Sequence, residues 1–307
     1  MIDIGINYIT EKETISNKYD NIYKFLVKKG YINTIKYPGR YCDLENLKNV
    51  IKISQETKSK LDVHGLPQMV SAIYSEDFIK NIEWNKLKIK NIARISTHMG
   101  LKNGEKLNDY SEKELEDTFK NNIKKLKSNI KELTGRDVEF GLENIPGGFQ
   151  FDLDTIKPEF VGDNWEKVDF GIFDIAHAKL SAKELKITYK EYIDRLKNKD
   201  KVKILHVSGN IDETNKYANK PDKHVLINKN EINDIIEAIK TFKNIDLVVS
   251  EYAYNTKYSI EKELLIEAIV LSNIVKTMDE HKSQEILEHL EKNLENDISN
   301  IECIMKY

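Results

Sequence analysis

The chain has 307 residues, of which 40% are hydrophobic, and a formal net charge of -3 at pH 7. This length can form one large core, and the slightly acidic balance argues against a protein that binds nucleic acid through bulk positive charge. Two cysteines suggest no disulfide framework, and the N-terminus begins as a strand with neither a signal peptide nor an apolar run of about 20 residues, so we expect a cytoplasmic protein with no membrane partner.

Short apolar runs alternate with amphipathic helical patterns along the chain. The predicted strands are Ile2–Ile6, Thr34–Lys36, Leu61–His64, Ile92–His98, Asp137–Leu142, Asp169–Asp174, Lys203–Val207 and Asp246–Glu251. The predicted helices are Asn21–Lys29, Leu44–Thr57, Glu112–Leu133, Lys183–Lys197, Lys229–Phe242 and Ser259–Val275. Strands that are apolar on both faces and alternate with helices indicate a parallel sheet, and eight of them indicate an α/β fold of the (β/α)₈ TIM barrel type. A doubly wound open sheet is the alternative, although no GxGxxG motif follows the first strand.

The C-terminal part, from Thr277 on, is predicted to be a charged helix with one apolar side. That side consists of Ile286, Leu287, Leu290, Leu294 and Ile298. It fits either a helix appended to the outer ring of the barrel or a dimer contact. We therefore expect a barrel over residues 1–276, with a metal site at its C-terminal face, and a helical extension over residues 277–307 packed on it.

Nine residues that could bind a metal lie at or just after the ends of predicted strands. They are His64, His98, Glu143, Asp174, His177, His206, Asp222, His224 and Glu251. In a barrel these junctions all lie at the C-terminal face, where active sites occur. Taken singly, each has a simpler explanation, such as a structural histidine or, for Asp222 after Pro221, a turn residue. Taken together they would bury several ionisable groups at one barrel mouth, which is costly unless something pairs them.

Divalent cations are the simplest partners for such a cluster. Five imidazoles and four carboxylates suit zinc, manganese or iron better than calcium or magnesium. Nine groups also exceed the four ligands of one tetrahedral site. The sequence thus predicts two or three divalent ions, with zinc as the first choice and manganese or iron as alternatives.

These motifs make the chain similar to the xylose-isomerase-like barrel superfamily, and most similar to its type IV apurinic/apyrimidinic endonuclease branch. The motifs are Val63-His64-Gly65, Thr97-His98-Met99-Gly100, Gly141-Leu142-Glu143-Asn144, Asp174-Ile-Ala-His177, Leu205-His206-Val207, Asp222-Lys-His224 and Ser250-Glu251. The resemblance covers roughly residues 2–255 and rests on the order of the ligands.

The resemblance implies three metal sites. The first would be held by His64, His98 and Glu143, the second by Glu143 as a bridge with Asp174, His206 and Glu251, and the third by His177, Asp222 and His224. It also implies hydrolysis of a phosphoester, such as damaged DNA, by a metal-bridged hydroxide, with Glu143 and Glu251 as catalytic residues. The aromatic and basic loop at residues 36–41 would contact the substrate through Tyr37, Arg40 and Tyr41, or would be an ordinary Pro-Gly turn.

Two segments depart from the endonuclease pattern. Gly65-Leu66-Pro67-Gln68 lacks the tyrosine that follows the first ligand histidine in those enzymes, and Val225-Leu226-Ile227-Asn228 lacks their glycines. Both segments concern substrate binding and not the metal ligands. The DNA substrate is therefore less firmly implied than the metal centre.

Two other activities of the same superfamily fit the motifs. In a sugar isomerase or epimerase, one metal would be held by Glu143, Asp174, His206 and Glu251, and the two glutamates would act as acid and base on a small sugar. A multinuclear iron oxygenase that modifies a peptide is a further alternative. A barrel used only for binding is the weakest hypothesis, because nothing else would stabilise the cluster of charges.

Overall fold

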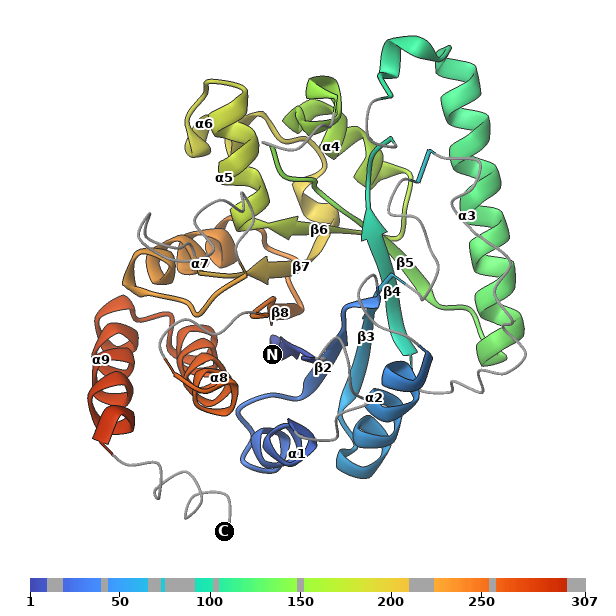
Figure 1. Ribbon diagram of the computed structural model, residues 1–307. Coiled ribbons are helices and arrows are strands. Elements are labelled where there is room, and N and C mark those ends of the chain that lie inside the picture. The colour runs from blue at the N-terminus through green and yellow to red at the C-terminus, as the bar shows by residue number, and fades with distance from the viewer. Residues whose placement is uncertain are drawn as a thin grey trace.

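The computed structural model describes residues 1–9, 19–39, 44–65, 73–74, 92–101, 105–147, 152–209, 224–253 and 258–296. Eight parallel strands close into one barrel in chain order, with the last strand paired to the first (Figure 1). The strands are β1 Asp3–Asn7, β2 Thr34–Tyr37, β3 Lys60–His64, β4 Ile92–His98, β5 Glu139–Glu143, β6 Phe170–Asp174, β7 Val202–Val207 and β8 Leu247–Ser250. The predicted TIM barrel is confirmed, and the closed sheet excludes the open alternative.

The described helices lie outside this barrel (Figure 1). They are α1 Asp20–Lys28, α2 Leu44–Thr57, α3 Glu112–Thr134, α4 Pro158–Glu166, α5 Ile175–Glu184, α6 Tyr189–Arg195, α7 Lys229–Thr241, α8 Ile260–Thr277 and α9 Glu280–Asn296. The single helix predicted over Lys183–Lys197 is wrong, because Lys186 adopts a left-handed φ of 58° and divides the segment. Helix α5 instead begins directly after β6, where Asp174 accepts a hydrogen bond from the His177 amide as an N-cap.

The interior of the barrel has an apolar part and a charged part. The apolar part is a separate buried cluster on β6, β7 and β8, made of Phe170, Ile172, Ile204, Leu247 and Val249. The charged part lies on β2, β3 and β4, where Lys36, Asp62 and Arg94 are neighbours in register. Since side chains alternate between the two faces of a strand, residues in register share the inner face.

Glycine at position 141 of β5 makes room for an aromatic ring inside the barrel. A Cβ atom at this position would lie 2.2 Å from the Phe170 ring. The Phe170 ring of the adjacent strand β6 can therefore pack over β5 because Gly141 has no side chain.

The C-terminal helix α9 packs against α7 and α8, as Figure 1 shows. Leu287 is buried, Ile286 and Leu290 pack against the main core, and Lys229 of α7 forms an ion pair of 3.0 Å with Glu288. The predicted apolar side thus packs on the barrel, whereas the side chain of Leu294 and all of Ile298 lie outside the described residues. The domain boundary between residues 276 and 277 stays a prediction.

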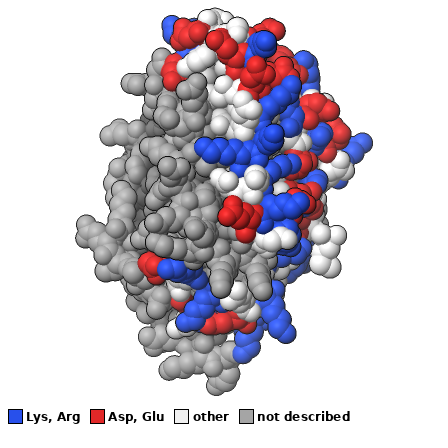
Figure 2. Space-filling view, turned by 90° about the vertical axis from the view of Figure 1, so that its right-hand side faces the viewer, with Lys and Arg blue, Asp and Glu red and all other residues white. Residues whose placement is uncertain are grey.

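Acidic and basic side chains are interspersed on the face of the molecule that carries α3 (Figure 2). Lys120 pairs there with Glu116 at 2.6 Å, and Lys131 pairs with Asp137 at 3.1 Å. The described part of this face shows no broad patch of a single sign, in agreement with the mixed charges of the sequence. In the described parts of the chain, no helix combines the length and apolar character needed to cross a membrane.

Candidate metal centre

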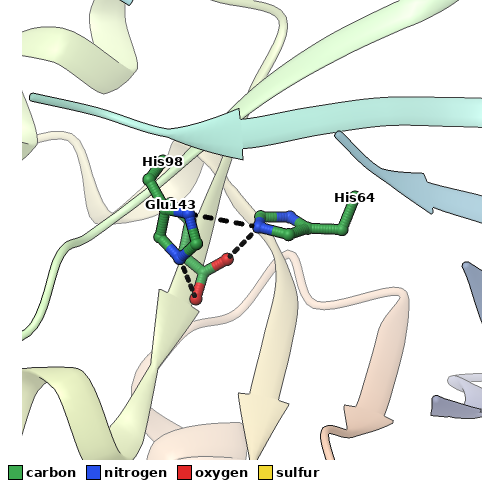
Figure 3. Close-up of side chains that lie close together, drawn as sticks. All are labelled: His64, His98 and Glu143. Carbon is green, nitrogen blue, oxygen red and sulfur yellow. Dashed lines mark hydrogen bonds and ion pairs between the residues drawn. The ribbon is translucent and has the colours of Figure 1, made fainter. Parts of the chain in front are cut away.

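The first group of donor atoms comes from the ends of three adjacent strands, β3, β4 and β5. His64, His98 and Glu143 each place one ligand atom within 4.8 Å of the others. The Nε2 atom of His64 lies 3.3 Å from Glu143 Oε2, and Nε2 of His98 lies 3.8 Å from Oε1 (Figure 3). Two imidazoles and one carboxylate converging in this way form a donor set suited to a transition metal or zinc.

The neighbouring strand fixes the orientation of His64. Its Nδ1 atom lies 2.9 Å from the hydroxyl of Ser96, which is buried in β4. If Nδ1 of His64 donates to this hydroxyl, Nε2 of His64 keeps its lone pair. This Nε2 atom faces Glu143 and lies 3.4 Å from Nδ1 of His98. Ser96 therefore performs the orienting function that hydrogen-bond partners of metal-binding histidines commonly have.

The second group comes from the segments that follow β6, β7 and β8 and consists of His177, His224 and Glu251. Nδ1 of His224 lies 3.4 Å from Glu251 Oε2, and the carbonyl of His224 accepts a hydrogen bond from Ala253 N at 2.8 Å. His224 has a φ of 39°, a left-handed conformation that is uncommon for residues other than glycine and that clusters at functional sites. His224 is thus held beside the segment that follows β8.

A third group, Glu143, Asp174, His177 and Glu251, connects the first two. Asn144 holds this part of the mouth together, because its side-chain oxygen accepts from Asp174 N at 2.7 Å and its amide donates to Asp174 O at 3.1 Å. The carbonyl of Asn144 also lies 2.8 Å from His177 Nδ1, which leaves Nε2 as the nitrogen with a lone pair. The Glu-Asn pair of the sequence motif therefore supplies both a candidate ligand and the residue that aligns β5 with β6.

The structure groups the predicted ligands differently from the three predicted sets. The first set, His64, His98 and Glu143, is brought together as predicted. Of the second set, His206 lies outside all three groups formed by the described residues, and His177 is found beside Asp174 instead. Asp222, predicted for the third set, lies outside the described residues.

Lys36 is a component of the site that the sequence analysis did not identify. Its side chain is fully buried inside the barrel, and its ammonium group donates to Glu251 and contacts His206 Nε2 at 3.1 Å. Lys36 was predicted both as the last residue of the strand Thr34–Lys36 and as the first residue of a basic loop. The informative signal was a lysine within a strand whose two faces are both buried, a position that lysine occupies only when paired.

The surroundings of the Glu143 carboxylate indicate whether the cluster is suited to a metal. This carboxylate is fully buried, and neither oxygen accepts a hydrogen bond of good geometry from the described residues. Four imidazole nitrogens nevertheless surround it, with His177 and His206 at 3.2 and 3.1 Å in addition to the two histidines of the first group. A buried carboxylate that is close to imidazoles without being bonded to them fits a centre completed by divalent cations.

The protonation states favour metal binding. Burial lowers the pKa of His64 well below its usual value and that of His206 to about 4, so both imidazoles are neutral at pH 7. Burial tends to raise the pKa of Glu143, but the surrounding His206, His98 and His64 outweigh it and hold the pKa well below its usual value. Neutral imidazoles and an ionised carboxylate are the forms that coordinate metal.

The predicted substrate loop is only partly described. Tyr37 is fully buried in the main hydrophobic core, so the expectation that its ring contacts a substrate is corrected. The cause is strand alternation, which directs Lys36 into the barrel and its neighbour Tyr37 to the other face of β2. Arg40 and Tyr41 lie outside the described residues.

Glu267 of α8 supports the loops behind Glu251, and its protonation gives a testable pH dependence. It is fully buried, accepts from Ser250 Oγ at 2.5 Å and from Ile227 N at 2.9 Å, and burial raises its pKa to about 8. Between pH 4.5 and 8 the folded state therefore holds a proton that the unfolded state releases, so this group costs stability as the pH rises.

We expect Glu267→Gln to match the wild type in unfolding free energy near pH 5 and to exceed it by on the order of a few kcal/mol at pH 8.5. Urea unfolding at both values measures this difference, and Glu237→Gln on the exposed side of α7 is the control. Parallel pH profiles for wild type and Glu267→Gln would contradict the assignment.

The chain resembles known proteins only weakly. No protein-family model matches the sequence, and a comparison with curated proteins gives no match. Similar solved structures include AsfvAP:AG, with 12% identity over 90% of this chain and 99% of that chain and a TM-score of 0.49. An L-ribulose 3-epimerase has 13% identity over 97% of this chain and 99% of its own, also with a TM-score of 0.49. A probable 2-pyrone-4,6-dicarboxylic acid hydrolase from Acinetobacter baumannii has 13% identity over 94% and 96% of the two chains and a TM-score of 0.46. The named activities differ, and with TM-scores below 0.5 these likenesses assign no activity to the chain. The endonuclease branch stays a prediction.

Proposed function

We propose that the chain is a metal-dependent hydrolase that cleaves phosphoesters at a multinuclear centre in the barrel mouth. The observation that carries this proposal is the presence of two donor groups that share no residue. One is His64, His98 and Glu143, and the other is His177, His224 and Glu251. An isomerase that uses one metal needs only one such group, whereas two ions can hold both the attacking and the leaving oxygen of a phosphoester.

Divalent ions in these groups would make water nucleophilic at neutral pH and stabilise the charge on the leaving oxygen. The chain supplies an ionised carboxylate at Glu143 and a neutral imidazole at His64, which are already in the required protonation state. The side chains of His98 and His224 are 20% and 22% exposed, whereas Glu143 is fully buried. A substrate would therefore reach the centre from the side of these two histidines.

Sugar isomerisation or epimerisation is the second candidate, and one observation favours it. Glu143, Asp174, His177 and Glu251 form a single group of four, which is sufficient for one ion. In this case the two glutamates would also exchange a proton with the substrate carbon. The two hypotheses differ in the number of ions and in the need for His64.

Metal analysis and substrate assays, performed side by side, distinguish these functions. Protein purified without chelators is expected to contain at least two zinc, manganese or iron ions per chain by mass spectrometry. It is also expected to hydrolyse a bis-aryl phosphate or an abasic-site oligonucleotide, and His64→Ala should abolish this activity. The matched control is His289→Ala, on the exposed face of α9. One ion per chain together with conversion of a ketose from a panel of sugars would refute the hydrolase and support the epimerase.

A further inference from the structure

Lys36 is a fixed positive charge in the candidate metal centre. The register of β2 with β3 places it inside the barrel beside Asp62, and its side chain is fully buried. Its ammonium group forms an ion pair with Glu251 Oε1. A buried ammonium needs such a partner, because an unpaired charge in the interior is strongly unfavourable.

The donors and acceptors around Lys36 also define the role of His206. Nδ1 of His206 lies 3.1 Å from Glu143 Oε2 and 3.2 Å from Glu251 Oε1. It forms no hydrogen bond of good geometry with Glu143, but its approach to two carboxylates assigns the ring proton to Nδ1. Lys36 Nζ, which can only donate, lies 3.1 Å from Nε2 and 3.4 Å from Nδ1, so the closer nitrogen, Nε2, is the acceptor. Both ring nitrogens are thus used within the protein, and His206 has no lone pair left for a metal.

The contacts of Glu251 agree with the conclusion that His206 contacts protein groups and not a metal. The Oε1 atom of Glu251 faces Lys36 and His206, whereas its Oε2 atom faces His224. The three donor groups that the described residues form include Glu251 twice and His206 never. Lys36 and His206 therefore occupy one corner of the centre, and the donor groups occupy the remainder.

We propose that the Lys36 ammonium takes the place of a cation at the corner between His206 and Glu251, so that this barrel binds two divalent ions and not three. This inference rests on the metal centre of the proposed function and deepens it. In this arrangement Lys36 is a positioning residue that turns Glu251 Oε2 toward His224. The charge that a third ion would bring to the buried carboxylates is supplied permanently by the chain.

The test is the number of ions bound per chain when Lys36 loses its charge. Lys36→Met retains most of the side-chain length and removes the ammonium, which frees His206 Nε2 and Glu251 Oε1. After saturation with manganese or zinc and removal of excess metal, we expect two ions in the wild type and one additional ion in Lys36→Met. The control is Lys60→Met, which removes an exposed lysine at the start of β3. A folded Lys36→Met protein that binds the same number of ions as the wild type would overturn the proposal.

His206→Gln gives an independent answer, also in the case that Lys36→Met does not fold. If His206 only bonds Lys36 and the carboxylates, this variant should bind the same number of ions as the wild type. Loss of one ion would show that His206 is a ligand and would overturn the proposal. Neither count depends on catalysis. Two ions without phosphoester hydrolysis would refute the proposed function alone, and three ions with hydrolysis would refute this inference alone.

Discussion

Glu143→Gln is expected to empty the first donor group and to lower phosphoester hydrolysis by about 100-fold or more, because even residues that merely orient metal ligands commonly contribute 10- to 100-fold. Glu143 is the carboxylate around which the centre is built, with nitrogens of His64, His177 and His206 at 3.1 to 3.3 Å. Glutamine has nearly the same shape but no charge to balance a divalent ion. Metal content per chain and turnover number, measured on the same preparation, test the expectation.

The control is the same substitution at the other end of the same strand. Glu139 lies at the base of the barrel and pairs with Arg94 and Lys203 at 3.2 and 2.8 Å. Glu139→Gln should therefore lower stability modestly and leave the metal content unchanged. Full metal content in a folded Glu143→Gln protein would show that the cluster is not organised around this carboxylate.

Gly141→Ala is expected to cost about 1–3 kcal/mol of unfolding free energy, the usual range for overpacking a core. The added methyl group would lie 2.2 Å from the Phe170 ring, a distance that forces the ring or the strand to move. Because residues 141 and 170 are paired across β5 and β6, a shift of the ring also disturbs the barrel near the ligands. Urea unfolding of the variant and the wild type measures the cost.

A double-mutant cycle identifies the cause of this loss. Phe170→Leu removes the ring that would collide with the new methyl group, so Gly141→Ala should cost clearly less in that background than in the wild type. Coupling energies of 0.5–3 kcal/mol are usual for residues in contact. Equal costs in both backgrounds would mean that the loss arises from the strand backbone and not from the ring.

Much of the fold was predictable because each barrel strand is a short run with two buried faces. β4 matches its predicted limits of Ile92–His98, and the other strands differ from theirs by one or two residues at an end. The division of Lys183–Lys197 into two helices was not predicted, because it depends on the backbone angle of Lys186. The start of α5 was also missed, because Asp174 is both a candidate ligand and a helix cap.

Most candidate ligands of the site were predictable, whereas their grouping was predictable only for His64, His98 and Glu143. Each histidine or carboxylate was found by its place at a strand end, which brings it to the mouth in any closed parallel barrel. Which ligand atoms meet depends on side-chain rotamers and on hydrogen bonds such as those between His64 and Ser96 and from the Asp174 amide to Asn144 Oδ1. Lys36 was missed because a lysine beside a Tyr-Pro-Gly sequence resembles a loop residue more than a core residue.

The apolar cluster inside the barrel fills the space beneath the candidate ligands, so the site is closed on the side of the N-terminal ends of the strands. Phe170, Ile172 and Val249 lie below the level of Asp174 and Glu251, and Arg94 covers the Phe170 ring from the base while paired with Asp246. Among the described residues of the centre, His98 and His224 are partly exposed, so small molecules would reach the centre beside these two histidines. If the centre binds metal as proposed, substrate entry, product release and metal exchange would share this opening, and a bound product would shield the ions from a chelator until it dissociates.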